Sequence, residues 1–261
     1  MPEGDTVWRA ARQLDRALSG KTLTSTDVRV PAYATWDLSG ATVVDTVSRG
    51  KHLLTRIDAH ERWTLHTHLK MEGSWRILEP GQKWPRPGHT ARIVLETDDT
   101  VAVGFQLGIV EIVARDRESE IVGHLGPDLL GPDWDADEAV RRLREQPERT
   151  IKEALLDQTR LAGVGNMYAN ELCFISGVAP ETPVGAVPDL HRMVARAHQL
   201  LDLNRHRGVQ STTGDLGRGR NFWVHQRGGR PCRRCGTRVV ETMLGDVGRE
   251  RTTYACPACQ R

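Results

Sequence analysis

The 261-residue chain is poor in several features, and each scarcity excludes a class of protein. Five cysteines are too few for a disulfide scaffold in a chain of this length. No run approaches the roughly 18 apolar residues that a membrane span needs, so we expect no association with a membrane. The N-terminus lacks a basic stretch followed by an apolar one, so we expect no secretory signal.

Lysine is also scarce, since only five of the 36 basic residues are lysine. The net charge of +2 conceals an asymmetry: residues 205–261 hold twelve arginines and four acidic residues, a net +8, which leaves −6 for residues 1–204. A basic segment on an acidic body is typical of a protein that meets a polyanion with one part of its surface. A GC-rich genome that supplies arginine in place of lysine is the alternative explanation.

Hydrophobic patterning predicts an α+β protein. Residues 6–18 carry apolar side chains at helical spacing, and Gly20 would close that helix. Short β-branched runs with turn residues between them follow up to residue 114, which predicts a β-sandwich against which the helix packs. The apolar helix positions are Val7, Ala11, Leu14 and Leu18, and the runs are 42–47, 52–57, 92–96 and 108–113.

The second half of the chain changes to helical patterns, at 137–145, 151–158, 166–176 and 189–204. We therefore expect two domains. An N-terminal domain spans 1–123, and the Gly/Pro/Asp-rich segment 124–135 is a linker. A helical domain spans 136–221 and ends in a mobile basic loop, 208–221, which holds few apolar residues. A cysteine-bearing tail spans 222–261.

That tail carries two CxxC pairs, which predict a structural zinc ion. Each pair places two thiolates on one tight turn, and two turns complete a tetrahedron around zinc. A turn-rich centre at Gly245–Gly248 predicts a β-hairpin between the pairs. Two redox-active dithiols are the alternative, although nothing nearby resembles a thioredoxin unit. The four ligands are Cys232, Cys235, Cys256 and Cys259, and the arginines of this finger are Arg233, Arg234, Arg238, Arg249 and Arg251. The fifth cysteine, Cys173, is expected in an apolar core.

A glycine-rich turn, Leu161–Asn166, lies between two predicted helices. Gly163 and Gly165 would let the backbone approach a partner closely. Asn166 would then stand at a helix N-terminus, where N–H groups and the helix dipole favour an anion. A plain connection between two core helices is the alternative.

The N-terminus reads Met1-Pro2-Glu3-Gly4-Asp5. Removal of Met1 would expose the secondary amine of Pro2, and an α-amino group has a neutral fraction at pH 7 that a lysine lacks. Such an amine can attack a sugar C1′ to give an iminium, with Glu3 as the adjacent proton donor. A frayed terminus is the alternative.

Taken together, these features give the sequence a specific resemblance. It resembles the formamidopyrimidine-DNA glycosylase/endonuclease VIII family of bifunctional base-excision repair enzymes, in the endonuclease VIII branch of actinobacterial type. The matching segments span nearly the whole chain in the family's order: MPEGD, SRGKHLL, HLKMEGSW, HLGPDLL, LLDQTRLAGVGNMYANE, CRRCG and RTTYACPACQ.

The resemblance implies a role for each matched residue. Pro2 would be the nucleophile, Glu3 the general acid, and Lys51 and Arg251 the phosphate-gripping residues that assist β- and δ-elimination. The remaining DNA contacts would be a loop that fills the space of the flipped nucleotide, a position before the helical domain and a helix–two-turn–helix clamp; these residues are Lys70, Met71, His124, Gly163, Gly165 and Asn166.

Two departures from the family pattern stand out. Asp5 and Thr6 occupy positions where the family usually has Pro and Glu, so a second glutamate near the sugar is missing. The segment 104–112 lacks the Arg-Phe-Gly wedge of the formamidopyrimidine branch, which leaves Met71 as the plug.

The resemblance thus implies a monomeric DNA glycosylase and AP lyase that removes oxidised bases, pyrimidines before purines. Its partner would be damaged DNA, duplex, single-stranded or bubble, and its cofactor one structural Zn²⁺. We expect it in the cytoplasm, on the nucleoid. Two alternatives stay open: a non-catalytic or weakly catalytic binder of abasic or nicked DNA, and a zinc-ribbon module that binds RNA.

Overall fold

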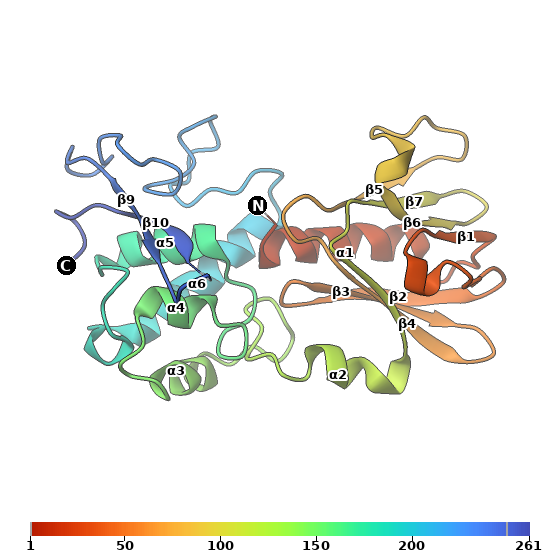
Figure 1. Cartoon of the computed structure of the whole chain (residues 1–261), viewed down its shortest axis with the longest axis horizontal. Coiled ribbons are helices and arrows are strands. Elements are labelled where there is room, and N and C mark those ends of the chain that lie inside the picture. Colours follow the sequence, from red (N-terminus) through yellow and green to blue (C-terminus); the bar gives the residue numbers. More distant parts are fainter. Residues whose placement is uncertain (1, 249) are drawn as a thin grey trace. The chain divides into compact units, whose positions relative to one another are not determined.

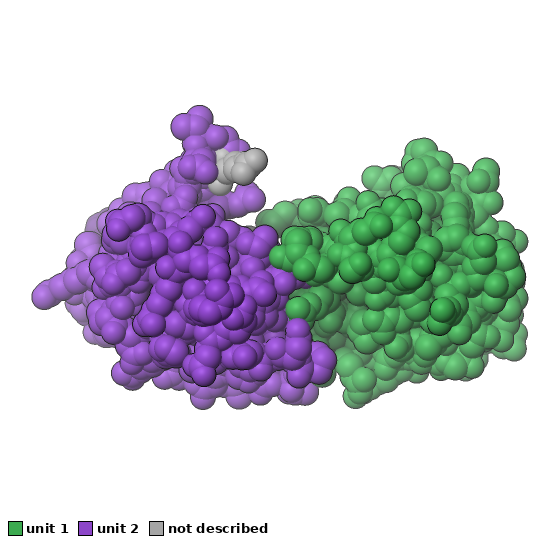
Figure 2. All heavy atoms as spheres, turned by 90° about the horizontal axis from the view of Figure 1, so that it is seen from below, with its two compact units in different colours: residues 1–2, 6–124 green, residues 3–5, 125–261 purple. Residues whose placement is uncertain are grey.

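A computed structural model describes residues 2–248 and 250–261 (Figure 1). Met1, whose removal would expose the amine of Pro2, and Arg249 of the finger lie outside the described residues. The chain divides into two compact units (Figure 2). Pro2 and residues 6–124 belong to the first unit, and residues 3–5 together with the described part of 125–261 belong to the second. Helix α1 (Gly4–Leu18) therefore begins in one unit and continues in the other.

The first unit is built on two four-stranded antiparallel sheets. One sheet has the order β1-β6-β7-β5 and the other β2-β3-β4-β8. The strands of the first are β1 (Ser25–Val28), β6 (Ala91–Glu96), β7 (Val101–Phe105) and β5 (Ser74–Leu78). Those of the second are β2 (Thr42–Arg49), β3 (His52–Asp58), β4 (Arg62–His68) and β8 (Ile109–Ala114).

Helix α1 and both sheets share one hydrophobic core. The four apolar helix positions that the sequence singles out, Val7, Ala11, Leu14 and Leu18, are all buried. They pack with side chains such as Leu53 of β3 and Ile93 of β6, and each such buried aliphatic chain contributes roughly 1.5–3 kcal/mol. Gly20 follows the helix with a φ of 77°, a left-handed conformation that favours glycine. The expected β-sandwich with a packed N-terminal helix is confirmed.

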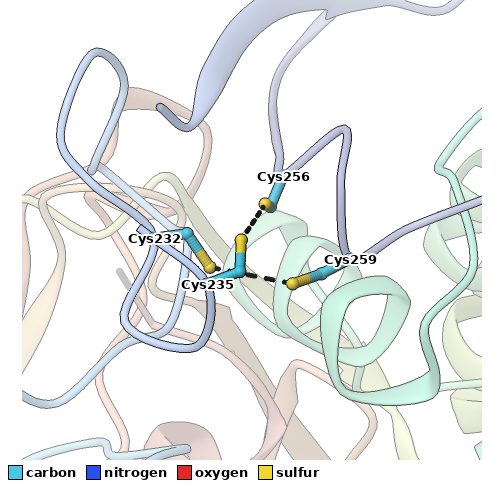
Figure 3. A group of neighbouring side chains, drawn as sticks. All are labelled: Cys232, Cys235, Cys256 and Cys259. Atoms are coloured by element: carbon cyan, nitrogen blue, oxygen red, sulfur yellow. Dashed lines mark hydrogen bonds between the residues drawn. The ribbon is translucent and has the colours of Figure 1, made fainter. Parts of the chain in front are cut away.

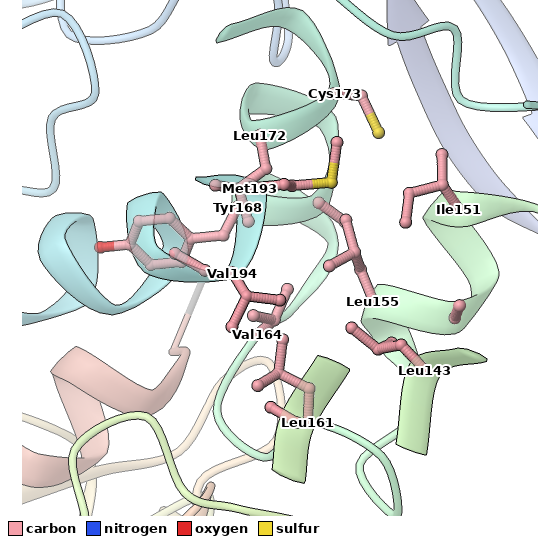
Figure 4. Close-up of a cluster of buried hydrophobic side chains, with 14 of the residues drawn as sticks. Leu143, Ile151, Leu155, Leu161, Val164, Tyr168, Leu172, Cys173, Met193 and Val194 are labelled. Atoms are coloured by element: carbon pink, nitrogen blue, oxygen red, sulfur yellow. The ribbon is translucent and has the colours of Figure 1, made fainter. Parts of the chain in front are cut away.

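The second unit is helical and has its own core (Figure 4). Its main helices are α3 (Ala136–Arg144), α4 (Ile151–Leu156), α5 (Asn166–Ser176) and α6 (Leu190–Arg205). Helix α5 is buried along most of its length, and Cys173 lies in this core as expected. The short helix α2 (Glu118–Val122) belongs to the first unit. The remaining helical turns are the 3-10 segments Pro31–Tyr33, Gly88–Thr90, Arg115–Arg117 and Val184–Ala186.

The tail forms the expected β-hairpin, from β9 (Val240–Leu244) and β10 (Arg251–Ala255). A small core joins it to helix α5, with Phe174, Val224 and Tyr254 among its members. The hairpin is therefore anchored to the helical part of the second unit at its base.

Two segments differ from what the sequence predicts. The segment 124–135 is not a free linker, because Leu129 is fully buried and its N–H donates to Ala162 O at 3.2 Å. Its backbone from residue 125 onward belongs to the second unit. The loop 208–221, expected to be mobile, is tied to α6 where Ser211 N donates to Asn204 Oδ1 at 3.0 Å. Its ends are also joined, since Asn221 Nδ2 donates to Gln210 O at 2.9 Å.

Among the described residues, no helix is both long enough and apolar enough to span a bilayer.

Candidate functional site

Glu3 is the best-held residue of the N-terminal motif. Its side chain is fully buried, and its carboxylate lies against the first turn of α5. The two oxygens accept hydrogen bonds from Gly165 N at 2.7 Å, Met167 N at 2.8 Å and Tyr168 N at 3.4 Å. The N–H groups that open α5 thus find their acceptor in a residue more than 160 positions away, and the helix dipole favours its negative charge.

The two glycines of the predicted turn make this approach possible. A Cβ on Gly165 would lie 2.5 Å from Glu3 Cδ, so only glycine leaves room for the carboxylate. Gly163 has a φ of 109°, and its carbonyl accepts a 2.9 Å hydrogen bond from Gly4 N. The prediction that this helix N-terminus binds an anion needs a correction, because the anion at its N–H groups is the protein's own Glu3.

Asp5 is also held by hydrogen bonds, in its case from side chains. Its buried carboxylate accepts hydrogen bonds from Tyr168 Oη at 3.1 Å and from Gln210 Nε2 at 2.8 Å. Burial, together with the charges of Asp5 and Glu3, raises the pKa of Tyr168 far above its usual range. Tyr168 is therefore a neutral hydrogen-bond donor that fixes Asp5.

Asn166 contacts the hairpin of the tail. Its Nδ2 donates to Thr252 O of β10 at 2.9 Å, while its Oδ1 is buried and has no hydrogen-bond partner among the described residues. Arg251, the residue before Thr252, is exposed at the start of β10. The structure thus brings the predicted clamp residue Asn166 and the predicted phosphate contact Arg251 to neighbouring positions.

Lys152, which the sequence analysis missed, holds the same strand. Its ammonium is buried on α4 and donates to Thr252 O at 3.0 Å and Thr253 Oγ1 at 2.5 Å. Burial lowers the pKa of Lys152 to about 8. The only sequence signal was a lysine, rare in this chain, in a short helix that is mostly apolar.

Glu171, also missed, fixes the chain that follows the loop 208–221. Its buried carboxylate accepts from the N–H groups of Trp223, Val224 and His225, each at 2.8 Å, and from the hydroxyl of Thr212. Burial raises the pKa of Glu171 despite these donors. Its partners lie about 50 residues away, so no local pattern could identify it.

The other predicted DNA contacts belong to the first unit. Lys51 occupies the tight turn between β2 and β3. Lys70 and Met71 directly follow β4 and are exposed, Met71 with 59% of its surface accessible. Lys70 has a φ of 50°, and Gly108 lies so close to its side chain that a Cβ there would meet Lys70 Cγ at 2.2 Å. His124 is exposed, with its ring 6.5 Å from that of His52.

Pro2, the predicted nucleophile, is half-buried immediately before Glu3. Three predicted site residues of the second unit meet at the start of α5: Glu3, Gly165 and Asn166. Arg251 lies next in the chain to Thr252, whose carbonyl accepts the hydrogen bond from Asn166. The other predicted DNA contacts, Lys51, Lys70, Met71 and His124, belong to the first unit.

The four predicted ligand cysteines form a compact cluster (Figure 3). Their sulfur atoms all lie within 4.8 Å of one another, with Cys235 Sγ and Cys256 Sγ 3.4 Å apart. Four metal–sulfur bonds of about 2.3 Å in tetrahedral geometry would separate the sulfurs by about 3.8 Å. The donor set and its spacing therefore fit one tetrahedral metal ion without rearrangement of the fold.

Comparison with protein families finds two matches. The model of the formamidopyrimidine-DNA glycosylase N-terminal domain matches residues 1–106, and that of the formamidopyrimidine-DNA glycosylase H2TH domain matches residues 125–209. The two matched stretches contain the N-terminal motif and the glycine-rich turn before α5.

Full-length relatives agree with these matches. The chain is 52% identical over 263 residues to a probable endonuclease 8 2 of Streptomyces coelicolor, with all of this chain and 94% of that protein covered. It is 54% identical over 260 residues to the DNA-(apurinic or apyrimidinic site) lyase Nei2 of Mycolicibacterium smegmatis, with 100% and 99% covered.

Among solved structures, the fold is similar to that of Lactococcus lactis Fpg in a complex with DNA that contains an abasic site. The TM-score is 0.82 over the whole of both chains, at 23% sequence identity. A likeness at this level of identity establishes the fold.

Proposed function

Since the chain belongs to the formamidopyrimidine-DNA glycosylase/endonuclease VIII family, we propose that it is a bifunctional DNA glycosylase and AP lyase of base-excision repair. The observation that carries this proposal is the arrangement of Pro2 and Glu3. Three N–H groups of the α5 N-terminus hold the Glu3 carboxylate, directly after the residue whose amine would react. A residue anchored in this way fixes the position of its neighbour in the chain.

The proposed chemistry begins with a flipped nucleotide, because C1′ is out of reach inside the stack. The lone pair of the Pro2 amine bonds to C1′ as the glycosidic bond breaks, and the base departs with that electron pair and with the proton that the Pro2 nitrogen gives up. Glu3, once it has taken a proton from solvent, delivers it to the ring oxygen as the sugar opens, which leaves a C1′ iminium on Pro2 and a carboxylate on Glu3. This step requires a free amine on Pro2 and therefore the removal of Met1.

The iminium then acidifies the C2′ proton. Loss of that proton expels the 3′ phosphate, and loss of a further sugar proton expels the 5′ phosphate, so that a one-nucleotide gap with phosphate ends remains. Lys51 and Arg251 would bind the phosphates on either side of the lesion, and Asn166 would clamp the backbone. Lys70, Met71 and His124 would contact the DNA where the nucleotide has left the stack.

Zinc is the metal that best suits the four-cysteine cluster. One Zn²⁺ held by Cys232, Cys235, Cys256 and Cys259 would fill all four coordination positions, so its role would be structural. It would fix the hairpin that carries Arg251.

Oxidised pyrimidines are the proposed preferred lesions, with oxidised purines second, in a protein that acts as a monomer on chromosomal DNA in the cytoplasm. The resemblance to the endonuclease VIII branch, to which the name of the Streptomyces coelicolor relative also points, supports this order. A strand-incision assay on a panel of oxidised, abasic and undamaged duplexes, bubbles and single strands tests it, with protein whose N-terminus is verified by mass spectrometry.

A second candidate function, binding of abasic or nicked DNA without excision, is favoured by one observation. Asp5 is engaged by Tyr168 and Gln210, and Thr6 stands where the family usually has a second glutamate. Incision of an oxidised-pyrimidine duplex by the parent but not by P2G supports the enzyme. Tight binding to abasic DNA without incision by the parent supports the binder.

A further inference from the structure

Three histidines share one end of the sheet formed by β2, β3, β4 and β8, and the proposed chemistry uses none of them. His52 pairs with His68 across β3 and β4, and His66 pairs with Leu54, two residues along. Because side chains alternate between the faces of a strand, all three imidazoles project from the same face of the sheet. The ring centroids of His52 and His66 are 5.0 Å apart, and those of His52 and His68 are 5.1 Å apart.

Hydrogen bonds order these rings into a chain. Glu111 Oε2 on β8 lies 2.9 Å from His66 Nδ1, and His66 Nε2 lies 2.9 Å from His52 Nδ1. A carboxylate only accepts, so His66 carries its proton on Nδ1 and accepts at Nε2. His52 then donates from Nδ1, which leaves a lone pair on its Nε2. His66 is 1% exposed, whereas His52 is half-buried, so the outer end of the chain is the one that an incoming group meets first.

The groups that surround His52 come from every neighbouring segment. Glu111 is the negative group, reached through His66. Burial, with the charges of His66, His68, His124 and Lys70, lowers the pKa of His52 to about 3. The pKa of His68 is lowered to about 4 by burial and by Lys70 and Lys51. Arg49 of β2 is the register partner of His52. At neutral pH the rings are thus uncharged and lie near the cations Lys51, Lys70 and Arg49, an environment that favours the binding of an anion.

A metal ion does not explain this cluster. Within residues 2–248 and 250–261, the four cysteines are the group whose ligand atoms converge as a metal site requires. Both ring nitrogens of His66 are engaged in hydrogen bonds, one with Glu111 and the other with His52, so neither is available to a metal ion.

We propose that His52, backed by His66 and Glu111, is a further phosphate-binding residue that takes up one proton when a phosphodiester of the DNA reaches it. The inference rests on the proposed function, which already assigns a phosphate to Lys51, the residue before His52. The phosphate supplies the negative charge that the cluster lacks and favours the imidazolium form.

The proton balance of this step is simple. Solvent supplies one proton to His52 Nε2, which then donates an N–H bond to a non-bridging phosphate oxygen, and no covalent bond to the DNA forms or breaks. The positive charge stays on His52 and is stabilised by its Nδ1–H bond to His66, which keeps its own proton on Nδ1 for Glu111.

Titration calorimetry tests the inference by counting protons. Parent protein is titrated with a duplex that contains a tetrahydrofuran abasic analogue, in two buffers of different ionisation enthalpy, at about pH 6 and pH 8. We expect uptake of a substantial fraction of one proton at the lower pH and almost none at the higher. As the pH falls from about 8 to about 6, the affinity of the parent for this duplex should rise about threefold more than the affinity of H52Q does.

Variants distinguish proton uptake by the hydrogen-bonded histidines from uptake by other titrating groups. H52Q should lose the uptake, and E111Q, which keeps an acceptor for His66 but removes the charge, should reduce it. H60Q is the matched control, since His60 is exposed in the turn at the opposite end of the same hairpin, and it should take up as many protons as the parent. H66Q breaks the chain at its centre and replaces H52Q if melting shows that the H52Q substitution unfolds the sheet.

The outcomes are distinct. Parent-like proton uptake by H52Q and H66Q would overturn the inference, as would tight binding by the parent with no uptake at about pH 6. In both cases the parent still incises damaged DNA and the proposed function stands. A parent that neither binds nor incises lesion duplexes overturns both.

Discussion

Among single residues, three buried charged side chains do most to organise the second unit. Glu3, Lys152 and Glu171 all pair with main-chain groups of distant segments. A buried charge costs several kcal/mol unless hydrogen bonds replace water, so each of these side chains fixes its partner segment in one position. The segments they fix are the N-terminus of α5, strand β10 and the chain around residue 224.

The buried ammonium of Lys152 makes the stability of the protein depend on pH. Its pKa of about 8 in the folded protein is lower than the ordinary value of 10.5. Between these two pH values the unfolded chain binds more protons at Lys152 than the folded protein does. The free energy of unfolding therefore rises with pH through this window, and this gain in stability is absent below about pH 8. We expect the stability of the parent relative to K152M to increase by about 2 kcal/mol from pH 7.5 to pH 10.

Denaturant unfolding of both proteins at several pH values measures this difference. A difference that stays constant across the window would show that the ammonium is not desolvated in the folded state. The comparison of two variants cancels the titration of groups that they share.

Some residues of the candidate site could be predicted from the sequence because they lie in local motifs, and others could not because their partners are distant in the chain. Pro2, Glu3 and Asn166 sit in motifs, and Gly163 and Gly165 mark a turn that demands glycine. Lys152, Glu171 and Asp5 act through partners between about 50 and 205 residues away, and these contacts exist only after folding. A charged residue at an apolar helix position was the one available hint.

At the scale of elements, the N-terminus of α5 holds the carboxylate of Glu3. We expect G165A to lower incision by at least about tenfold, because the new Cβ would meet Glu3 Cδ at 2.5 Å and displace the carboxylate that proton transfer needs. Single-turnover incision of an abasic duplex measures the effect.

G208A is the matched control, since no atom lies within 4 Å of a Cβ at Gly208. Parent-like incision by G165A, with circular dichroism unchanged, would mean that the contact between Glu3 and α5 is dispensable.

The hairpin of β9 and β10 depends on the four-cysteine cluster. We expect the purified protein to contain one zinc ion per chain, and C256S to lose the ion and bind lesion DNA at least about tenfold more weakly. C173S should keep the metal, because Cys173 lies in the helical core. Atomic absorption and a binding titration test both expectations, and a C256S protein with full zinc content would contradict the assignment of the ligands.

The elements themselves were largely predictable because each has a local signal. Helix α1 followed from four apolar positions, and α5 from the turn that precedes it. The segment 124–135 was mistaken for a linker because Gly, Pro and Asp also serve in tightly packed turns, and the N–H of Leu129 bonds to Ala162, a residue 33 positions away. The loop 208–221 holds few apolar residues but is fixed by polar ones, such as Ser211 and Asn221.

For the whole molecule, the uneven charge of the chain predicts how it meets DNA. Lys51 and Lys70 belong to the first unit and Arg251 to the second, and each is proposed to neutralise one phosphate. We expect the logarithm of the affinity for an abasic duplex to fall with the logarithm of salt concentration with a slope of about −3. R251Q should reduce the magnitude of the slope by about 1, whereas R144Q, an exposed change on α3, should leave it unchanged. Fluorescence anisotropy at several salt concentrations provides the slopes, and equal slopes for all three proteins would remove Arg251 from the interface.

The most direct measurement is the identity of the residue that bonds to the sugar. Parent protein is mixed with a duplex containing an abasic site, the intermediate is reduced with borohydride, and the digested adduct is sequenced by mass spectrometry. We expect a sugar attached to the amine of Pro2 in a chain that has lost Met1, and no adduct in P2G. An adduct on a lysine, or an active protein that retains Met1, would contradict it.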